Sequence, residues 1–138
     1  MIVESANLLL GKRIFIVEDD VINVFVLSKP LSMCGAKVYT NYNSIGIELH
    51  IVQHLPIDVI LLDIMLRNGV NGYDTFRNLR ANPDTRDIPV VAVTSLEPEI
   101  EIPKAISLGF AGFISKPIDM RTFAQDIADI IKGRKKWI

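Results

Sequence analysis

The chain has 138 residues, 49% of them hydrophobic and 22% charged, which is ordinary for one soluble globular domain. Its 15 basic and 16 acidic side chains give a formal net charge of -1, so the overall charge gives no reason to expect binding to nucleic acid or to a membrane. No apolar stretch reaches the roughly 18–20 residues of a membrane-spanning helix, and the N-terminus lacks the pattern of a signal peptide. We therefore expect a cytoplasmic protein.

The predicted elements alternate between strand and helix from the start of the chain. A short apolar run over 14–17 predicts a strand, and apolar residues at helical spacing predict a helix over 21–34. Asp20 is placed to cap this helix, and Pro30 inside it should bend the backbone. A second strand is predicted over 36–40.

The same alternation continues through the rest of the chain. The further predicted strands cover 59–62, 90–93 and 110–114, and the further helices end near His54 or cover 73–81 and 119–132. Two Asn-Gly pairs, Asn68-Gly69 and Asn71-Gly72, mark a loop before the helix over 73–81. Strands rich in valine and isoleucine that do not alternate with polar residues are typical of a parallel sheet buried on both faces. The pattern therefore predicts an α/β fold in which helices cover both faces of a five-stranded parallel sheet.

Polar side chains stand directly after four of these apolar runs. They are Glu18, Asp19, Asp63, Thr94, Ser95 and Lys116. The carboxyl ends of parallel strands lie along one edge of a sheet, where open α/β folds place their ligand sites. We therefore expect these side chains to converge into a site that suits a divalent cation and a phosphoryl group.

Four motifs together resemble a stand-alone receiver domain of two-component response regulators. They are IFIVEDD (14–20), VILLD (59–63), VVAVTS (90–95) and GFISKP (112–117), and the separations between them also resemble those of the family. The resemblance covers 12–132 and leaves 1–11 as a short N-terminal extension and 133–138 as a basic C-terminal tail. It implies the flavodoxin-like doubly wound (βα)5 fold with sheet order 2-1-3-4-5.

The resemblance assigns Asp63 as the residue that accepts a phosphoryl group from a sensor histidine kinase or a histidine phosphotransfer protein. It implies a Mg²⁺ site in which Asp19 and Asp63 bind the ion directly, Glu18 acts through water and Met65 offers its backbone carbonyl, since Mg²⁺ prefers hard oxygen ligands. Such a domain is a phosphoacceptor and, apart from slow auto-dephosphorylation, not an enzyme.

The switch of this family is expected at three further residues, with Lys116 beside the phosphoryl oxygens. Thr94 would bond the phosphoryl group, Ser95 leaves it room, and Phe113 occupies the position of the switch aromatic. The alternatives without a signalling role are a strand-ending turn at Thr94 and core packing for Phe113. A downstream protein would read the surface of the fourth helix, fifth strand and fifth helix, and whether two copies pair as a homodimer stays open.

Three departures from the family pattern carry expectations of their own. Arg67 stands where a proline is usual, so the loop that presents Met65 should differ. Pro98 and Pro103 interrupt the fourth helix, which we expect to be short or mobile. Met65 and Leu96 occupy sites that influence hydrolysis of the phosphoaspartate, and neither side chain can orient a water molecule. We therefore expect a long-lived phosphorylated state.

Other features have weaker functional meaning. His50 and His54 have the spacing of a shared metal site, but an exposed helix face is the simpler interpretation. The residues from Lys132 to Trp137 form a basic run with an aromatic, and a frayed, solvated helix end is expected there. Cys34 is the single cysteine of the sequence, so an internal disulfide is excluded. We expect it to be a buried small residue rather than a reactive thiol.

Two other functions are alternatives to that of a phosphoacceptor. A haloacid-dehalogenase-type phosphatase also uses a strand-end aspartate with Mg²⁺, but it needs a second aspartate where this chain has Met65. A receiver-like interaction module that is never phosphorylated is the stronger alternative. Such modules usually lack an acid or the lysine, whereas this chain has kept the full set.

Overall fold

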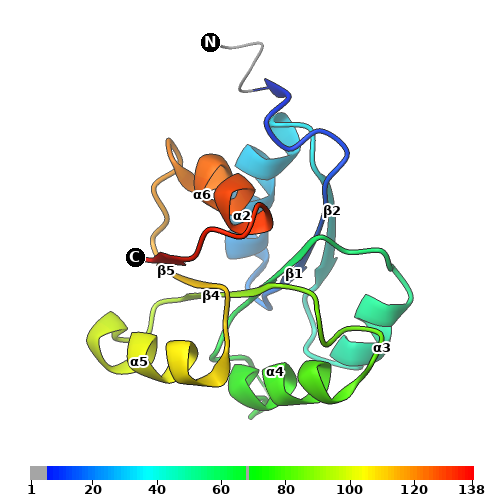
Figure 1. Cartoon of the computed structure of the whole chain (residues 1–138), viewed down its shortest axis with the longest axis vertical. Helices are drawn as coiled ribbons and strands as arrows, with labels where there is room; N and C mark the ends of the chain where they lie inside the picture. The colour runs from blue at the N-terminus through cyan, green and yellow to red at the C-terminus, as the bar shows by residue number, and fades with distance from the viewer. Residues whose placement is uncertain (1–5, 68) are drawn as a thin grey trace.

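The computed structural model describes residues 6–67 and 69–138, and its centre is a parallel sheet with helices on both faces (Figure 1). The strands are β1 (Arg13–Val17), β2 (Lys37–Asn41), β3 (Val59–Leu62), β4 (Val90–Thr94), β5 (Gly112–Ser115) and β6 (Lys136–Trp137). Their order is β2-β1-β3-β4-β5-β6. The predicted order 2-1-3-4-5 is confirmed, and a sixth strand is added beside β5.

Helices cover the sheet in two layers (Figure 1). They are α2 (Val21–Met33), α3 (Ile47–Val52), α4 (Gly72–Ala81), α5 (Pro98–Leu108) and α6 (Phe123–Ile131). Helices α2 and α6 pack on one face, around a core that includes Ile16 and Phe123. Helices α3, α4 and α5 pack on the other face, around Phe15 and Phe113. In the described part of the chain, no helix is long and apolar enough to cross a membrane.

Helix α2 begins where the sequence predicts. The carboxylate of Asp20 accepts hydrogen bonds from the backbone N–H groups of Ile22 (2.9 Å) and Asn23 (3.1 Å), which satisfies two of the free donors at the helix start. Pro30 is buried inside the helix, which continues to Met33.

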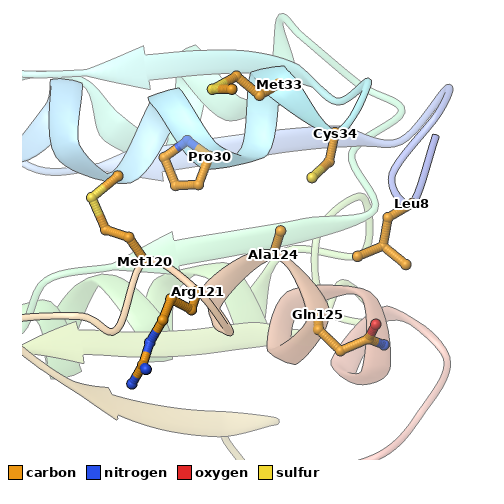
Figure 2. A pocket seen from close by; sticks show the side chains of 8 residues that line it. All are labelled: Leu8, Pro30, Met33, Cys34, Met120, Arg121, Ala124 and Gln125. Atoms are coloured by element: carbon orange, nitrogen blue, oxygen red, sulfur yellow. The ribbon is translucent and has the colours of Figure 1, made fainter. Parts of the chain in front are cut away.

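A hollow of about 350 Å³ lies between α2 and α6 (Figure 2). Pro30 and Cys34 line it from the side of α2, and Met120 and Ala124 from the other side. Cys34 is half-buried, and burial raises the pKa of its thiol. A raised pKa leaves little thiolate at neutral pH, which supports the predicted inert role.

The fourth helix was expected to be short or mobile, and the first part of this prediction was wrong, because α5 spans 11 residues. Pro98 stands in its first turn, where a backbone N–H has no intrahelical acceptor, so proline costs nothing there. Pro103 removes one internal hydrogen bond. The helix still continues, since Glu101 and Ala105 are buried on its inner side.

The prediction of a frayed, solvated helix end after Lys132 was also wrong. Helix α6 ends at Ile131, and Gly133, whose φ of +97° suits a residue without a side chain, follows its cap residue Lys132. The chain then returns along the sheet and forms β6 parallel to β5. A strand at the rim of a sheet offers free backbone donors and acceptors, and β6 satisfies those of β5.

Candidate functional site

The loops that follow β1, β3 and β5 bring the predicted polar residues together at one edge of the sheet. Lys116, directly after β5, donates from Nζ to Asp63 Oδ2 at 2.8 Å and also to Glu18 Oε1. Asp63 follows β3, and Glu18 follows β1. The predicted convergence of these three side chains is therefore present.

This cluster is buried and its charges depend on one another. Glu18 is only 2% exposed and Asp63 only 7%. Burial raises the pKa of Glu18, although the neighbouring ammonium of Lys116 acts against this rise. Burial alone would lower the pKa of Lys116, but its hydrogen bonds to Asp63 and Glu18 outweigh burial and raise it. Lys116 is therefore fully charged at neutral pH and compensates the carboxylates.

Asp19 faces a different set of partners. Its Oδ2 accepts from the backbone N–H of Arg67 and from Ser44 Oγ at 3.4 Å. The guanidinium of Arg67 is exposed, with Nε 4.0 Å from Asp19 Oδ1. A proline at position 67 would have no N–H to donate. The departure from the family pattern at Arg67 thus gives Asp19 a partner that the sequence analysis missed.

The donor atoms at this edge have the chemistry that Mg²⁺ requires. Glu18, Asp19 and Asp63 offer carboxylate oxygens, and no thiolate or imidazole belongs to the set. In residues 6–67 and 69–138, no group of three or more His, Cys, Asp or Glu side chains is arranged to hold a metal ion as it stands. Lys116 and the N–H of Arg67 occupy the carboxylates instead, so a bound cation would take the place of these contacts.

The loop after Asp63 is closed by backbone contacts. The N–H of Met65 donates to Asp63 Oδ1 at 3.2 Å, and the N–H of Gly72 donates to the carbonyl of Ile64 at 2.7 Å. Met65 also forms an antiparallel bridge with Asn71. Of the two predicted Asn-Gly turns, Asn68 lies outside the described residues. The bridge brings the chain back beside Asp63 before α4 begins.

The predicted switch residues take different positions. Thr94 ends β4, is 1% exposed, and accepts a hydrogen bond from the N–H of Leu96 at 3.4 Å. Ser95 is exposed. Phe113 is fully buried in the core under α3, α4 and α5. The peptide bond between Lys116 and Pro117 is cis.

The two histidines of α3 and of the turn that follows it are held by hydrogen bonds within the protein. The ring Nδ1 of His54 donates to the carbonyl of His50 at 2.8 Å, and Asn41 Nδ2 donates to His50 Nδ1 at 3.2 Å. Both rings are half-buried and pack against Phe15. The interpretation as an exposed helix face was therefore wrong, because the rings fill space beside the sheet.

Comparison with known proteins agrees with this geometry. The sequence model of the response regulator receiver domain matches residues 14–128. The response regulator PleD of Caulobacter vibrioides is 34% identical over 110 residues, which are 80% of this chain and 24% of PleD. Protein PilH of Pseudomonas aeruginosa is 29% identical over 121 residues, which are 88% of this chain and 98% of PilH. The chain thus spans about a quarter of PleD and nearly all of PilH.

Solved structures show the same fold. A response regulator from Desulfuromonas acetoxidans superposes with a TM-score of 0.77 at 24% identity, over 88% of this chain and 97% of that one. The receiver domain of the sensor histidine kinase PA1611 from Pseudomonas aeruginosa, solved with a magnesium ion in its active-site cleft, has a TM-score of 0.74 at 25% identity and covers 88% of this chain and 98% of its own. The chain therefore belongs to the response regulator receiver domain family of two-component signalling.

Proposed function

We propose that Asp63 accepts a phosphoryl group from a phosphohistidine and that this modification switches a surface read by another protein. The contact that supports the proposal best is the hydrogen bond between Lys116 Nζ and Asp63 Oδ2, at 2.8 Å. It places a permanent cation beside the one carboxylate that stands alone at the end of a central strand. A phosphoryl group bound to Asp63 would keep this ammonium as a partner.

In the transfer, an oxygen of the Asp63 carboxylate attacks phosphorus, and the bond between phosphorus and the histidine nitrogen breaks. The electron pair returns to the imidazole, which takes up a proton. Negative charge gathers on the phosphoryl oxygens during this step. Lys116 would move from Asp63 toward these oxygens and stabilise that charge.

Glu18, Asp19, Asp63 and the carbonyl of Met65 are the groups that would hold Mg²⁺. When bound, the ion neutralises the carboxylates and the transferring group, so that anions can approach one another. Asp63 must first exchange its contact with Lys116, and Asp19 its contact with the N–H of Arg67.

Phosphorylation would change the protein through Thr94 and Phe113. The hydroxyl of Thr94 accepts only a long hydrogen bond, at 3.4 Å, from Leu96, so turning it toward a phosphoryl oxygen costs little. Phe113, on the neighbouring strand, fills the core behind it. Both residues lie on strands next to α5 and α6, which suits a partner that contacts α5, β5 and α6.

The phosphorylated form should persist. Met65 is 66% exposed beside Asp63, and its apolar side chain cannot hydrogen-bond a water molecule. Leu96 is half-buried and equally apolar. Without a polar side chain at either position, an attacking water has no side chain there to orient it. A half-life of only seconds for the phosphorylated protein would contradict this expectation.

The interaction module that is never phosphorylated is kept as the second candidate. The observation that favours it is the engagement of Asp19 by the backbone N–H of Arg67, which competes with metal binding. Its prediction is simple: the protein would take up no phosphoryl group under any condition.

The test is intact mass after incubation with Mg²⁺ and acetyl phosphate. We expect one added phosphoryl group, absent in Asp63→Asn and in a chelated sample. Asp74→Asn, which removes an exposed carboxylate on α4, should still be labelled. No addition with acetyl phosphate or with histidine kinases would overturn the proposal in favour of the second candidate.

A further inference from the structure

Strand β6 fills the outer edge of β5 with backbone hydrogen bonds. The N–H of Ile138 donates to the carbonyl of Phe113 at 2.8 Å, and the N–H of Ser115 donates to the carbonyl of Ile138 at 3.3 Å. Ser115 Oγ donates to the same carbonyl at 2.9 Å. Three donors therefore fix a short extended segment at this edge, parallel to β5.

Acidic side chains on α6 select a basic residue in that segment. Lys136 Nζ lies 3.1 Å from Asp129 Oδ2 and 3.7 Å from Asp126 Oδ1. The side chain of Asp129 is only 9% exposed. A hydrogen bond from Gln125, together with nearby Lys136, lowers the pKa of Asp129, so the carboxylate is ionised at neutral pH. A neutral or acidic residue in place of Lys136 would remove the cation that lies nearest to this carboxylate. Asp129 would keep the hydrogen bond from Gln125 at 2.9 Å and the longer contact with the guanidinium of Arg134 at 3.5 Å.

The next position of the segment selects an aromatic residue, and the floor of the groove is shaped for a close backbone. Trp137 pairs with Phe113 in the sheet and packs, half-buried, against the core that contains Phe113. At Gly112, a Cβ atom would come within 2.9 Å of the carbonyl oxygen of Lys136 and 3.0 Å of Ile130 Cδ1. Glycine at this position thus permits the segment to lie as close as it does.

The groove continues beyond the residues that now fill it. A hollow of about 280 Å³ lies beside Ile138 and is lined by Pro117, Asp119 and Asp126, among others. Asp119 in this hollow is paired with Arg121 at 3.0 Å, so Asp126 is the carboxylate that would face another basic residue. A longer segment could therefore use both the backbone donors of β5 and this acidic hollow.

We propose that the groove between β5 and α6 is a binding site for an extended segment of a partner protein that carries a basic residue followed by an aromatic residue. The partner segment would add a parallel strand to β5 and place its cation against Asp126 and Asp129. In the free protein, residues 136–138 of this chain occupy the site and mimic that ligand. Strand addition of this kind takes its affinity from the backbone and its specificity from alternate side chains.

Because the chain's own segment occupies the groove, a partner segment must displace it in order to bind. An attached segment competes at a high effective concentration, so a separate peptide of the same sequence binds the native chain weakly. Weakening the attached segment should make the groove available. The groove is also part of the surface that is expected to contact a downstream protein. A partner that displaced the segment would therefore bind at that surface.

The first measurement asks whether the segment is docked in solution. Trp137 is the single tryptophan of the sequence, so its fluorescence reports this site alone. In the native chain, acrylamide should quench it less than it quenches the free peptide Arg-Lys-Lys-Trp-Ile. In Lys136→Glu the quenching should rise to the free-peptide value, whereas Lys135→Glu, at an exposed neighbour, should match the native chain. Native quenching equal to that of the free peptide would overturn the proposal.

The second measurement tests binding in trans. The same peptide, acetylated, is titrated into isotope-labelled native and Lys136→Glu chains and followed by amide chemical shifts. We expect shifts at Phe113 and Ser115 and an affinity at least about tenfold higher for Lys136→Glu. A peptide with glutamate before the tryptophan should bind at least about tenfold more weakly than the parent.

Equal affinity for both chains, shifts elsewhere, or no binding would overturn the proposal. Concentration-dependent dimerisation of the Lys136→Glu chain would also overturn it, because the segment would then belong to a second copy. Unchanged amide dispersion in the variant shows that it is folded. Neither measurement requires phosphorylation, so failure here is distinct from failure of the proposed function.

Discussion

Gly72 sets how closely helix α4 approaches the proposed phosphoacceptor. A Cβ atom at this position would lie 2.4 Å from the carbonyl oxygen of Asp63 and 2.7 Å from Ile64 Cα, whereas real Cβ contacts are essentially never under 3.0 Å. In Gly72→Ala, the loop after Asp63 must therefore open by at least 0.6 Å, the difference between 3.0 and 2.4 Å. Both obstructing groups are backbone, so no side chain can give way. We expect a loss of about 1–3 kcal/mol in the free energy of unfolding and slower phosphorylation.

Chemical denaturation and the initial rate of labelling by acetyl phosphate check both parts. Gly69→Ala is the matched control in the same loop, since its Cβ would meet nothing within 4 Å. Its φ of +70° gives alanine only a conformational cost of about 1–2 kcal/mol, and its labelling rate should stay near that of the native protein. Native stability together with a native labelling rate in Gly72→Ala would show that the loop after Asp63 does not need glycine at this position.

Three further substitutions test the site and its support. Lys116→Met leaves the buried carboxylate of Asp63 without its cation, so the free energy of unfolding should fall by about 3 kcal/mol. Saturating Mg²⁺ should stabilise this variant more than the native chain. An equal stabilisation of both chains by Mg²⁺ would contradict this prediction. Tyr73→Phe removes the 2.6 Å hydrogen bond to buried Glu101, and denaturant unfolding should show a loss of about 1–3 kcal/mol, with an unchanged midpoint as the opposing result. Burial, followed by the charge of a neighbouring histidine, lowers the pKa of His50 from 6.5, so its unfolded form binds the proton first and stability falls as the pH drops below about 6.5. In His50→Gln this decline between pH 6.5 and 5 should be shallower by up to about 1.4 kcal/mol per pH unit, and identical slopes would count against it.

The arrangement of the sheet and most of the site could be predicted because buried parallel strands have a distinctive composition. The apolar runs that end on Glu18, Asp63 and Thr94 locate strand ends directly, and parallel strands bring such ends to one edge. The contact of Lys116 with two carboxylates follows from the same rule. The exact loop that presents Met65 does not, because it depends on backbone bridges rather than on side-chain type.

Other features left weak signals in the sequence. The N–H of Arg67, which binds Asp19, has no signature except that position 67 is not proline. Strand β6 is too short for a periodic pattern, and its basic residues resemble those of a solvated tail. Pro98 resembles a helix breaker in the sequence, although proline is well tolerated in the first turn of a helix. For Arg67 and β6 the tertiary surroundings decide what local propensity leaves open, whereas for Pro98 the position within the helix decides.

The proposed function depends most directly on Asp63 as the residue that carries the phosphoryl group. Borohydride reduces an aspartyl phosphate to homoserine, so reduction after labelling, followed by peptide mass mapping, reads the modified position itself. We expect homoserine at position 63, and only when phosphodonor and Mg²⁺ are present together. Homoserine at another aspartate, or at none while the protein is folded and loaded with Mg²⁺, would contradict it.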